Sequence, residues 1–228
     1  MSRRRFCAFV AAFSLAAPVR AQSLRGITDA DAGKGLRAVL EAGAQAAVRL
    51  LGRPDGFLGN PRVRIPLPGY LKDAGRLLGA LGQGKQVEEL ELAMNRAAEQ
   101  AVPLAGKLLA DAVRGMSVRD ARDILAGGDT AVTDFFAQKT REPLSAQFLP
   151  VVRQQTARVG LKARYEALAQ KGVGLGLVRQ DDASIDHYVT RKALDALYIV
   201  IGEEEKKIRR DPAGSGSALL KKVFGALR

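Results

Sequence analysis

The sequence predicts an all-α fold, a single-domain bundle of several helices. Apolar residues recur every three to four positions through most of the chain, which is the period of an amphipathic helix. The chain is rich in Ala and Leu, which favour helices, and only 5% of it is aromatic. Its 228 residues suffice for one domain, and we find no internal repeat and no convincing strand.

The first helix is predicted over residues 29–51, after the Thr-x-x-acid capping pattern of Thr28 to Asp31. Residues 52–68 then contain four prolines and three glycines, which predicts a long Pro/Gly-rich connection. Alternating residues in this stretch resemble a strand, but Pro66 and Pro68 exclude a central one. We therefore expect an extended, ordered connection between helices.

The middle of the chain predicts kinked central helices. A short helix is expected over residues 70–81. From Lys85 to about Ala112 one mostly alanine face continues, but Pro103 lies inside it. The segment is therefore one kinked helix or two helices that meet at Ala101–Val102. Its small side chains let a neighbouring helix approach closely, so we expect it at the centre of the bundle.

The second half of the chain predicts further helices, each starting at a capping residue, a proline or a new apolar stripe. Their expected starts are Ser117 with Asp120, Asp129 or Thr130, Glu142–Pro143, Leu161, and Asp182 or Ser184. Pro150 predicts a kink. The last of these helices is expected to be the longest and to end at Arg210, before Pro212.

Residues 1–21 predict an export signal. Arg3 to Arg5 form a basic start, Phe6 to Ala17 form an apolar stretch, and Ala21 ends a cleavage pattern. The arginines suit the general secretory route and also resemble the twin-arginine motif. The alternative is an N-terminal core helix, but the stretch lacks an amphipathic period and is followed by Pro18.

Cleavage after Ala21 would change the charge and the redox chemistry of the chain. It removes four arginines, so 32 basic residues remain against 24 acidic ones and the net charge falls from +12 to +8. It also removes Cys7, the only cysteine, which suits an oxidising compartment. Residues 22–228 are then expected to form one periplasmic domain with no transmembrane span, because no apolar run is long enough.

The C-terminal segment predicts a contact with a partner. Residues 213–217 form a Gly/Ser hinge, and residues 218–228 form a short basic amphipathic helix. Leu220, Phe224, Lys221 and Lys222 are its candidate contact residues. Three occupants of its apolar face remain open: the protein's own core, a second copy in a homodimer, or an anionic membrane surface.

Six ordered motifs carry a resemblance to a known family. They are Pro54–Leu58, Met94–Glu99, Gly127–Ala131, Tyr188–Thr190 with Lys192–Asp195, Glu203–Arg209, and Leu219–Gly225. From about Ile27 to Leu227 the chain resembles the bacterial family catalogued as domain of unknown function 4197. The resemblance implies an exported, helix-rich single domain. That family has no assigned activity, so the resemblance implies no catalytic residues.

Two groups of polar residues are candidate ligand or anion contacts. Arg96 and Glu99 can pair on one helix face beside Asn95, so Arg96 could clamp a carboxylate or phosphate. The alternative is a structural network between helices. Asp129 and Thr130 lie at a helix N-terminus that could hold an anion, or they cap that helix themselves.

Neither a cofactor nor a metal site is expected. His187 is the only histidine, and it lacks the companion motifs of metal ligands or of a catalytic triad, so a solvated or capping role is the alternative to acid–base catalysis. No Walker lysine follows the glycines at 127 and 128, which argues against nucleotide binding. Export argues against nucleic acid as the partner of the basic chain.

The preferred function is a non-enzymatic periplasmic binding or scaffold protein for an envelope component. Its partner would be an anionic or apolar ligand, such as an envelope lipid or anionic polymer, or another protein. The alternative is a periplasmic hydrolase whose cleft is built from Arg96, Asp129, Asp134 or His187. That alternative requires these side chains to converge on one concave site.

Overall fold

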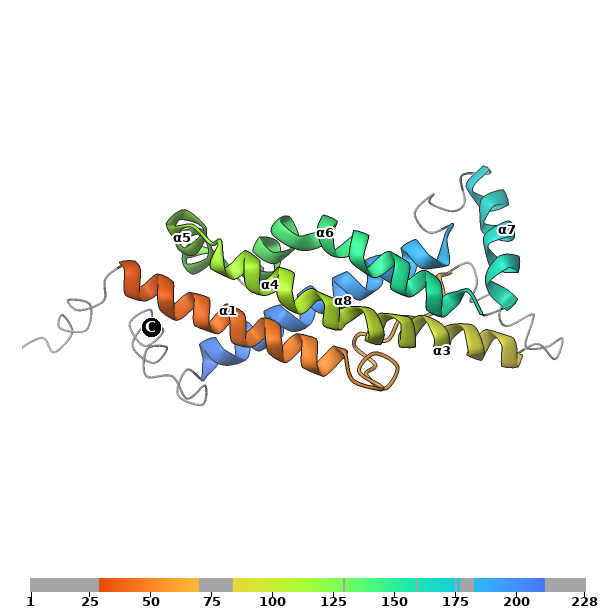
Figure 1. Ribbon diagram of the computed structural model, residues 1–228, viewed down its shortest axis with the longest axis horizontal. Helices are drawn as coiled ribbons and strands as arrows, with labels where there is room; N and C mark the ends of the chain where they lie inside the picture. Colours follow the sequence, from red (N-terminus) through yellow and green to blue (C-terminus); the bar gives the residue numbers. More distant parts are fainter. Residues whose placement is uncertain are drawn as a thin grey trace, which may run out of the picture.

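The computed structural model shows an elongated bundle of helices (Figure 1). It describes residues 29–69, 84–128, 130–158, 160–174, 176 and 183–211. The helices are α1 (Asp29–Leu51), α3 (Gly84–Ala101), η1 (Val102–Leu104), α4 (Ala105–Arg114), α5 (Val118–Ala126), α6 (Ala131–Thr156), α7 (Gly160–Gly174) and α8 (Ile185–Arg210). No strand occurs in these ranges, so the all-α single-domain bundle is confirmed.

The long helices run along the bundle, with α5 at one end and α7 at the other (Figure 1). α6 packs against α8 and α3, and α8 also packs against α1. α6 and α8 are antiparallel, because Thr133 lies beside Gly202 while Thr156 bonds to Asp186. One continuous hydrophobic core joins all of these helices, and Phe136 and Tyr198 are among its largest fully buried side chains.

Pro103 divides the central helical segment as the sequence predicts. α3 ends at Ala101, the 3-10 turn η1 contains Pro103, and α4 continues in the same general direction (Figure 1). Proline has no N–H to donate to the preceding turn, so the helix changes there to a tighter turn. Ala97, Ala98 and Ala101 are fully buried, as expected of a face that another helix approaches closely.

The predicted helix start at Glu142–Pro143 is wrong. α6 continues through both Pro143 and Pro150 as one helix of 26 residues. Its buried side chains recur at helical spacing on both sides of Pro143, with Phe136 and Thr140 before it and Leu144 after it. This packing against α3 and α8 outweighs the backbone hydrogen bonds that the two prolines cannot make.

The predicted boundaries of α5 and α8 are confirmed, with a difference in the capping of α8. The Ser117–Asp120 capping box opens α5, with each residue bonding to the backbone N–H of the other at 2.8 and 3.0 Å. α8 spans the predicted range, but the Ser184 side chain does not cap it and instead approaches Glu166. Among the helices that the structure describes, none is long and apolar enough to cross a bilayer.

Several predicted segments lie outside the described residues. They are the export signal at 1–21, the short helix at 70–81, the hinge at 213–217 and the C-terminal helix at 218–228.

Close packing between α6 and α8 depends on Gly202. A Cβ at this buried position would lie 2.7 Å from the Thr133 hydroxyl oxygen. We expect Gly202→Leu to lower the free energy of unfolding by about 2 kcal/mol or more, because the larger side chain forces the helices apart. The matched change Gly106→Leu on α4 meets open space and should stabilise by about 0.5 kcal/mol through helix propensity. Urea denaturation of both variants measures this difference; equal effects would contradict it.

Candidate functional site

Asn95 of α3 is fully buried and holds the connection at Ile65. Its Oδ1 accepts from the Ile65 N–H at 2.9 Å, and its Nδ2 donates to the Ile65 carbonyl at 2.9 Å and to the Glu91 carbonyl at 2.8 Å. Ile65 lies in a segment without helix or sheet, so its backbone groups need partners from elsewhere. The side-chain amide of Asn95 supplies both.

Glu99, one turn further along α3, holds the start of the same connection. The residue is only 3% exposed, and its Oε1 accepts from the backbone N–H groups of Phe57 at 3.0 Å and Leu58 at 3.2 Å. Its Oε2 accepts from Arg96 at 2.6 Å. The buried negative charge is therefore balanced by a guanidinium and by two backbone dipoles, which stabilises it in the interior.

Arg96 joins this cluster to the surface. Besides Glu99, it donates to Asp55 at 2.8 Å, and Asp55 has the left-handed backbone angle φ of 62°. The hydrogen bond from Arg96 to Glu99 raises the pKa of Arg96, and the bond to Asp55 acts in the same direction. The guanidinium thus bonds to two carboxylates, which neutralise its charge locally and weaken its attraction for a further anionic ligand.

The polar cluster borders an open hollow of about 500 Å³. Arg96 and Glu99 line it together with Gly52, Pro54, Gln100 and Pro103. Its walls include two prolines and the turn that ends α1, and its two charged residues, Arg96 and Glu99, are paired with each other. Chemically, the arrangement is suited to holding the connection in place.

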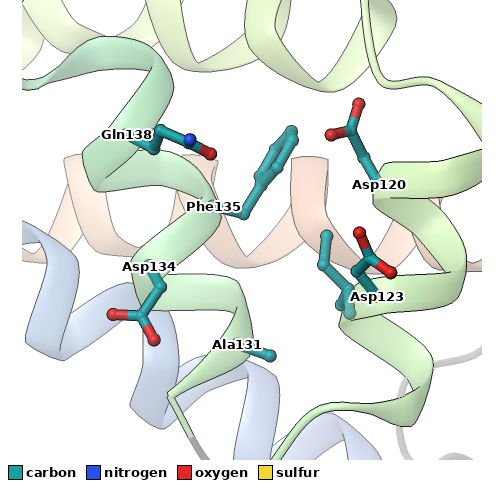
Figure 2. A pocket seen from close by; sticks show the side chains of 7 residues that line it. Asp120, Asp123, Ala131, Asp134, Phe135 and Gln138 are labelled. Carbon is teal, nitrogen blue, oxygen red and sulfur yellow. The ribbon is translucent and has the colours of Figure 1, made fainter.

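A second hollow of about 510 Å³ lies between α5 and α6 (Figure 2). Asp120 and Asp123 of α5 point toward it beside the ring of Phe135, whereas Asp134 points away from α5 (Figure 2). The backbone N–H and hydroxyl of Ser117 hold the pKa of Asp120 below its usual range. No group of three acidic, histidine or cysteine side chains within the described ranges has the geometry of a metal site.

The structure places the remaining candidates apart. Thr130 occupies the N-cap position of α6, but its side chain makes no capping hydrogen bond, contrary to the capping role considered for it. Asp129 lies outside the described residues. His187 is exposed in the first turn of α8. Arg96 and Asp134 line two separate hollows.

Sequence reasoning missed a buried ionic cluster around Asp186. Lys162 of α7 donates to both carboxylate oxygens at 2.7 Å, and Thr156 of α6 donates at 2.6 Å. The Arg153 Nε lies 3.6 Å from Oδ2 of the same carboxylate. These contacts join α6, α7 and α8. Nothing in the local sequence pattern indicates them, because the members of the cluster come from three different helices.

The C-terminal contact residues Leu220, Lys221, Lys222 and Phe224 lie outside the described residues.

If Asn95 has a structural role, its removal should unfold the protein more easily. Asn95→Ala leaves the backbone groups of Ile65 unpaired, so we expect a loss of about 3 kcal/mol in the free energy of unfolding. Gln100→Ala, an exposed change on the same helix, should alter it by less than about 0.5 kcal/mol. Chemical denaturation measures both, and an Asn95→Ala variant as stable as the parent would refute the structural role.

Comparison with known proteins supports the resemblance that the motifs carry. The family model described as a protein of unknown function, DUF4197, matches residues 26–225. Neither a curated protein nor a solved structure matches the chain. Because the matched region covers most of the sequence, the chain belongs to the DUF4197 family.

Proposed function

We propose that the protein is a non-enzymatic binding or scaffold protein of the bacterial cell envelope, exported to the periplasm. The observation that carries this proposal is the use of the polar residues on α3. Asn95 and Glu99 are buried and bonded to the backbone of the connection, and Arg96 is bonded to two carboxylates. The polar residues of α3 therefore hold the connection against the bundle.

The sequence supports the envelope part of the proposal. Residues 1–21 have the pattern of an export signal, and the remaining chain keeps a net charge of +8. Such a charge attracts anionic envelope components through interactions that salt weakens. Leu220, Lys221, Lys222 and Phe224 remain the residues proposed to contact a partner, a membrane surface or a second copy in a homodimer.

The hydrolase alternative has less support. A hydrolytic cleft needs a nucleophile or activated water, a base and an oxyanion donor within reach of one another. Arg96 and Asp134 line separate hollows, and His187 lines neither. Lys162 approaches the Thr156 hydroxyl at 3.3 Å, but Thr156 is fully buried and already donates to Asp186, so it offers no accessible nucleophile.

Export and ligand content can be tested together. The full chain, carrying a C-terminal tag, is expressed in a bacterium with two membranes and purified from its periplasm. Native mass spectrometry should show a chain that begins at Gln22. Either organic extraction should release a bound envelope component, or the native mass should reveal a defined assembly. A variant lacking residues 1–21 should remain in the cytoplasm.

Two results would contradict the proposal. One is a full-length chain retained in the cytoplasm, which would remove the envelope location. The other is turnover of ester, phosphate or peptide substrates that both Arg96→Gln and His187→Ala abolish while the fold is retained, which would favour the hydrolase.

A further inference from the structure

Positive charge is concentrated at one end of the bundle. We define the α7 end as the described residues of 148–174 and 183–194, which comprise the last part of α6, the whole of α7 and the first turns of α8. This end holds seven basic and two acidic residues, whereas the other described residues balance at 18 basic and 18 acidic. The charge excess of the described bundle therefore lies at the end where Figure 1 shows α7.

The two acidic residues of this end are turned inward. Asp186 is buried and bonded to Lys162 and Thr156, and Glu166 is half-buried beside Ser184. These bonds join α7 to α8, and through them both carboxylates are bonded to groups within the protein. Their effect is to leave the outer surface of the α7 end without an exposed carboxylate among its described side chains.

Basic side chains remain on the outside of the same end. Arg153 is 63% exposed and has only a 3.6 Å ion pair, and Arg158 is exposed in the turn between α6 and α7. Lys192 lies half-exposed against the ring of Tyr188. Guanidinium groups in this setting can bind phosphate oxygens with two hydrogen bonds each.

Acidic residues on the neighbouring helix reduce this charge without cancelling it. The start of α3, which packs against α7, carries Lys85 and three glutamates. One of the three, Glu91, is bonded to Arg64 at 2.8 Å. Counting these neighbours, the end still has a net positive charge.

We propose that the α7 end binds the surface of an anionic phospholipid bilayer. This inference rests on the proposed envelope function and names the surface that would make the contact. A few exposed cations bind a single soluble anion only weakly in water. A bilayer surface presents many phosphates at once, so the attraction of several basic residues adds up there. The elongated bundle would then stand on the membrane at this end, with its other end free for a partner.

Vesicle co-sedimentation of the chain without residues 1–21 tests this directly. Vesicles of phosphatidylcholine with about 30% phosphatidylglycerol should bind the protein at low salt, and binding should be lost in about 0.5 M salt, where charges are screened within a few ångströms. Vesicles of phosphatidylcholine alone should not bind it. Inorganic polyphosphate serves as the soluble polyanion for comparison.

Paired variants separate this surface from the overall charge. Arg153→Gln with Arg158→Gln should weaken binding to the anionic vesicles roughly tenfold or more. The control, Lys107→Gln with Arg119→Gln, removes the same charge from side chains that are 85% and 91% exposed outside the α7 end, and should weaken binding much less. Arg153 lies near Asp186, so its substitution could disturb the ionic cluster around Asp186. The single variant Arg158→Glu leaves that cluster intact, and it should also weaken binding to the anionic vesicles.

Three results would overturn the inference: no binding to anionic vesicles, equal losses in the two double variants, or binding to polyphosphate alone. If vesicles fail to bind but the purified protein is exported and carries an envelope component, only the membrane contact is wrong. A cytoplasmic full-length chain would instead contradict the proposed function, whatever the vesicles show.

Discussion

The rest of this structure depends on the hydrogen bonds between two side chains of α3 and the backbone of the connection after α1. The connection has neither helix nor sheet to satisfy its backbone, yet Phe57 and Ile65 lie in the core. Burying unpaired backbone N–H groups would be unfavourable. Asn95 and Glu99, four residues apart on one face of α3, bond to these groups and allow the segment to enter the core.

This interaction also explains why two distant motifs occur in the same chain. Pro54–Leu58 provides the turn and the backbone donors, and Met94–Glu99 provides the acceptors. Arg96 and Asp55 then close the contact at the surface. Two sequence motifs that resemble those of the family are thus one structural unit.

The sequence predicted those features that depend on local pattern. The bounds of α1 and α8, the break at Pro103 and the capping box at Ser117 all follow from periodicity, proline or capping chemistry. The helix start at Pro143 was wrong because tertiary packing against α3 and α8 keeps α6 continuous, and no local rule contains that packing. Sequence alone suggested that Arg96 and Glu99 pair, as they do, but could not identify the backbone partners of Glu99.

Contacts between distant helices were the least predictable. Asp186 is preceded by an apolar residue and followed by His187, a pattern that fits a solvated helix start equally well. Its burial follows from Lys162 and Thr156, which only the packing of α7 and α6 brings near. The same packing turns the acidic side chains of the α7 end inward. The composition shows the positive charge of the chain only as a sum, whereas the structure shows that the excess among the described residues lies at the α7 end.

Hydrogen exchange at the amides of Phe57, Leu58 and Ile65 tests the central claim most directly, because these three N–H groups donate hydrogen bonds to Glu99 and Asn95. If the two side chains hold the connection, these amides should exchange at least about 100-fold more slowly than unprotected ones. If they exchange as fast as exposed loop amides while the amides of α3 remain protected, the connection is not held by α3 and the account is wrong.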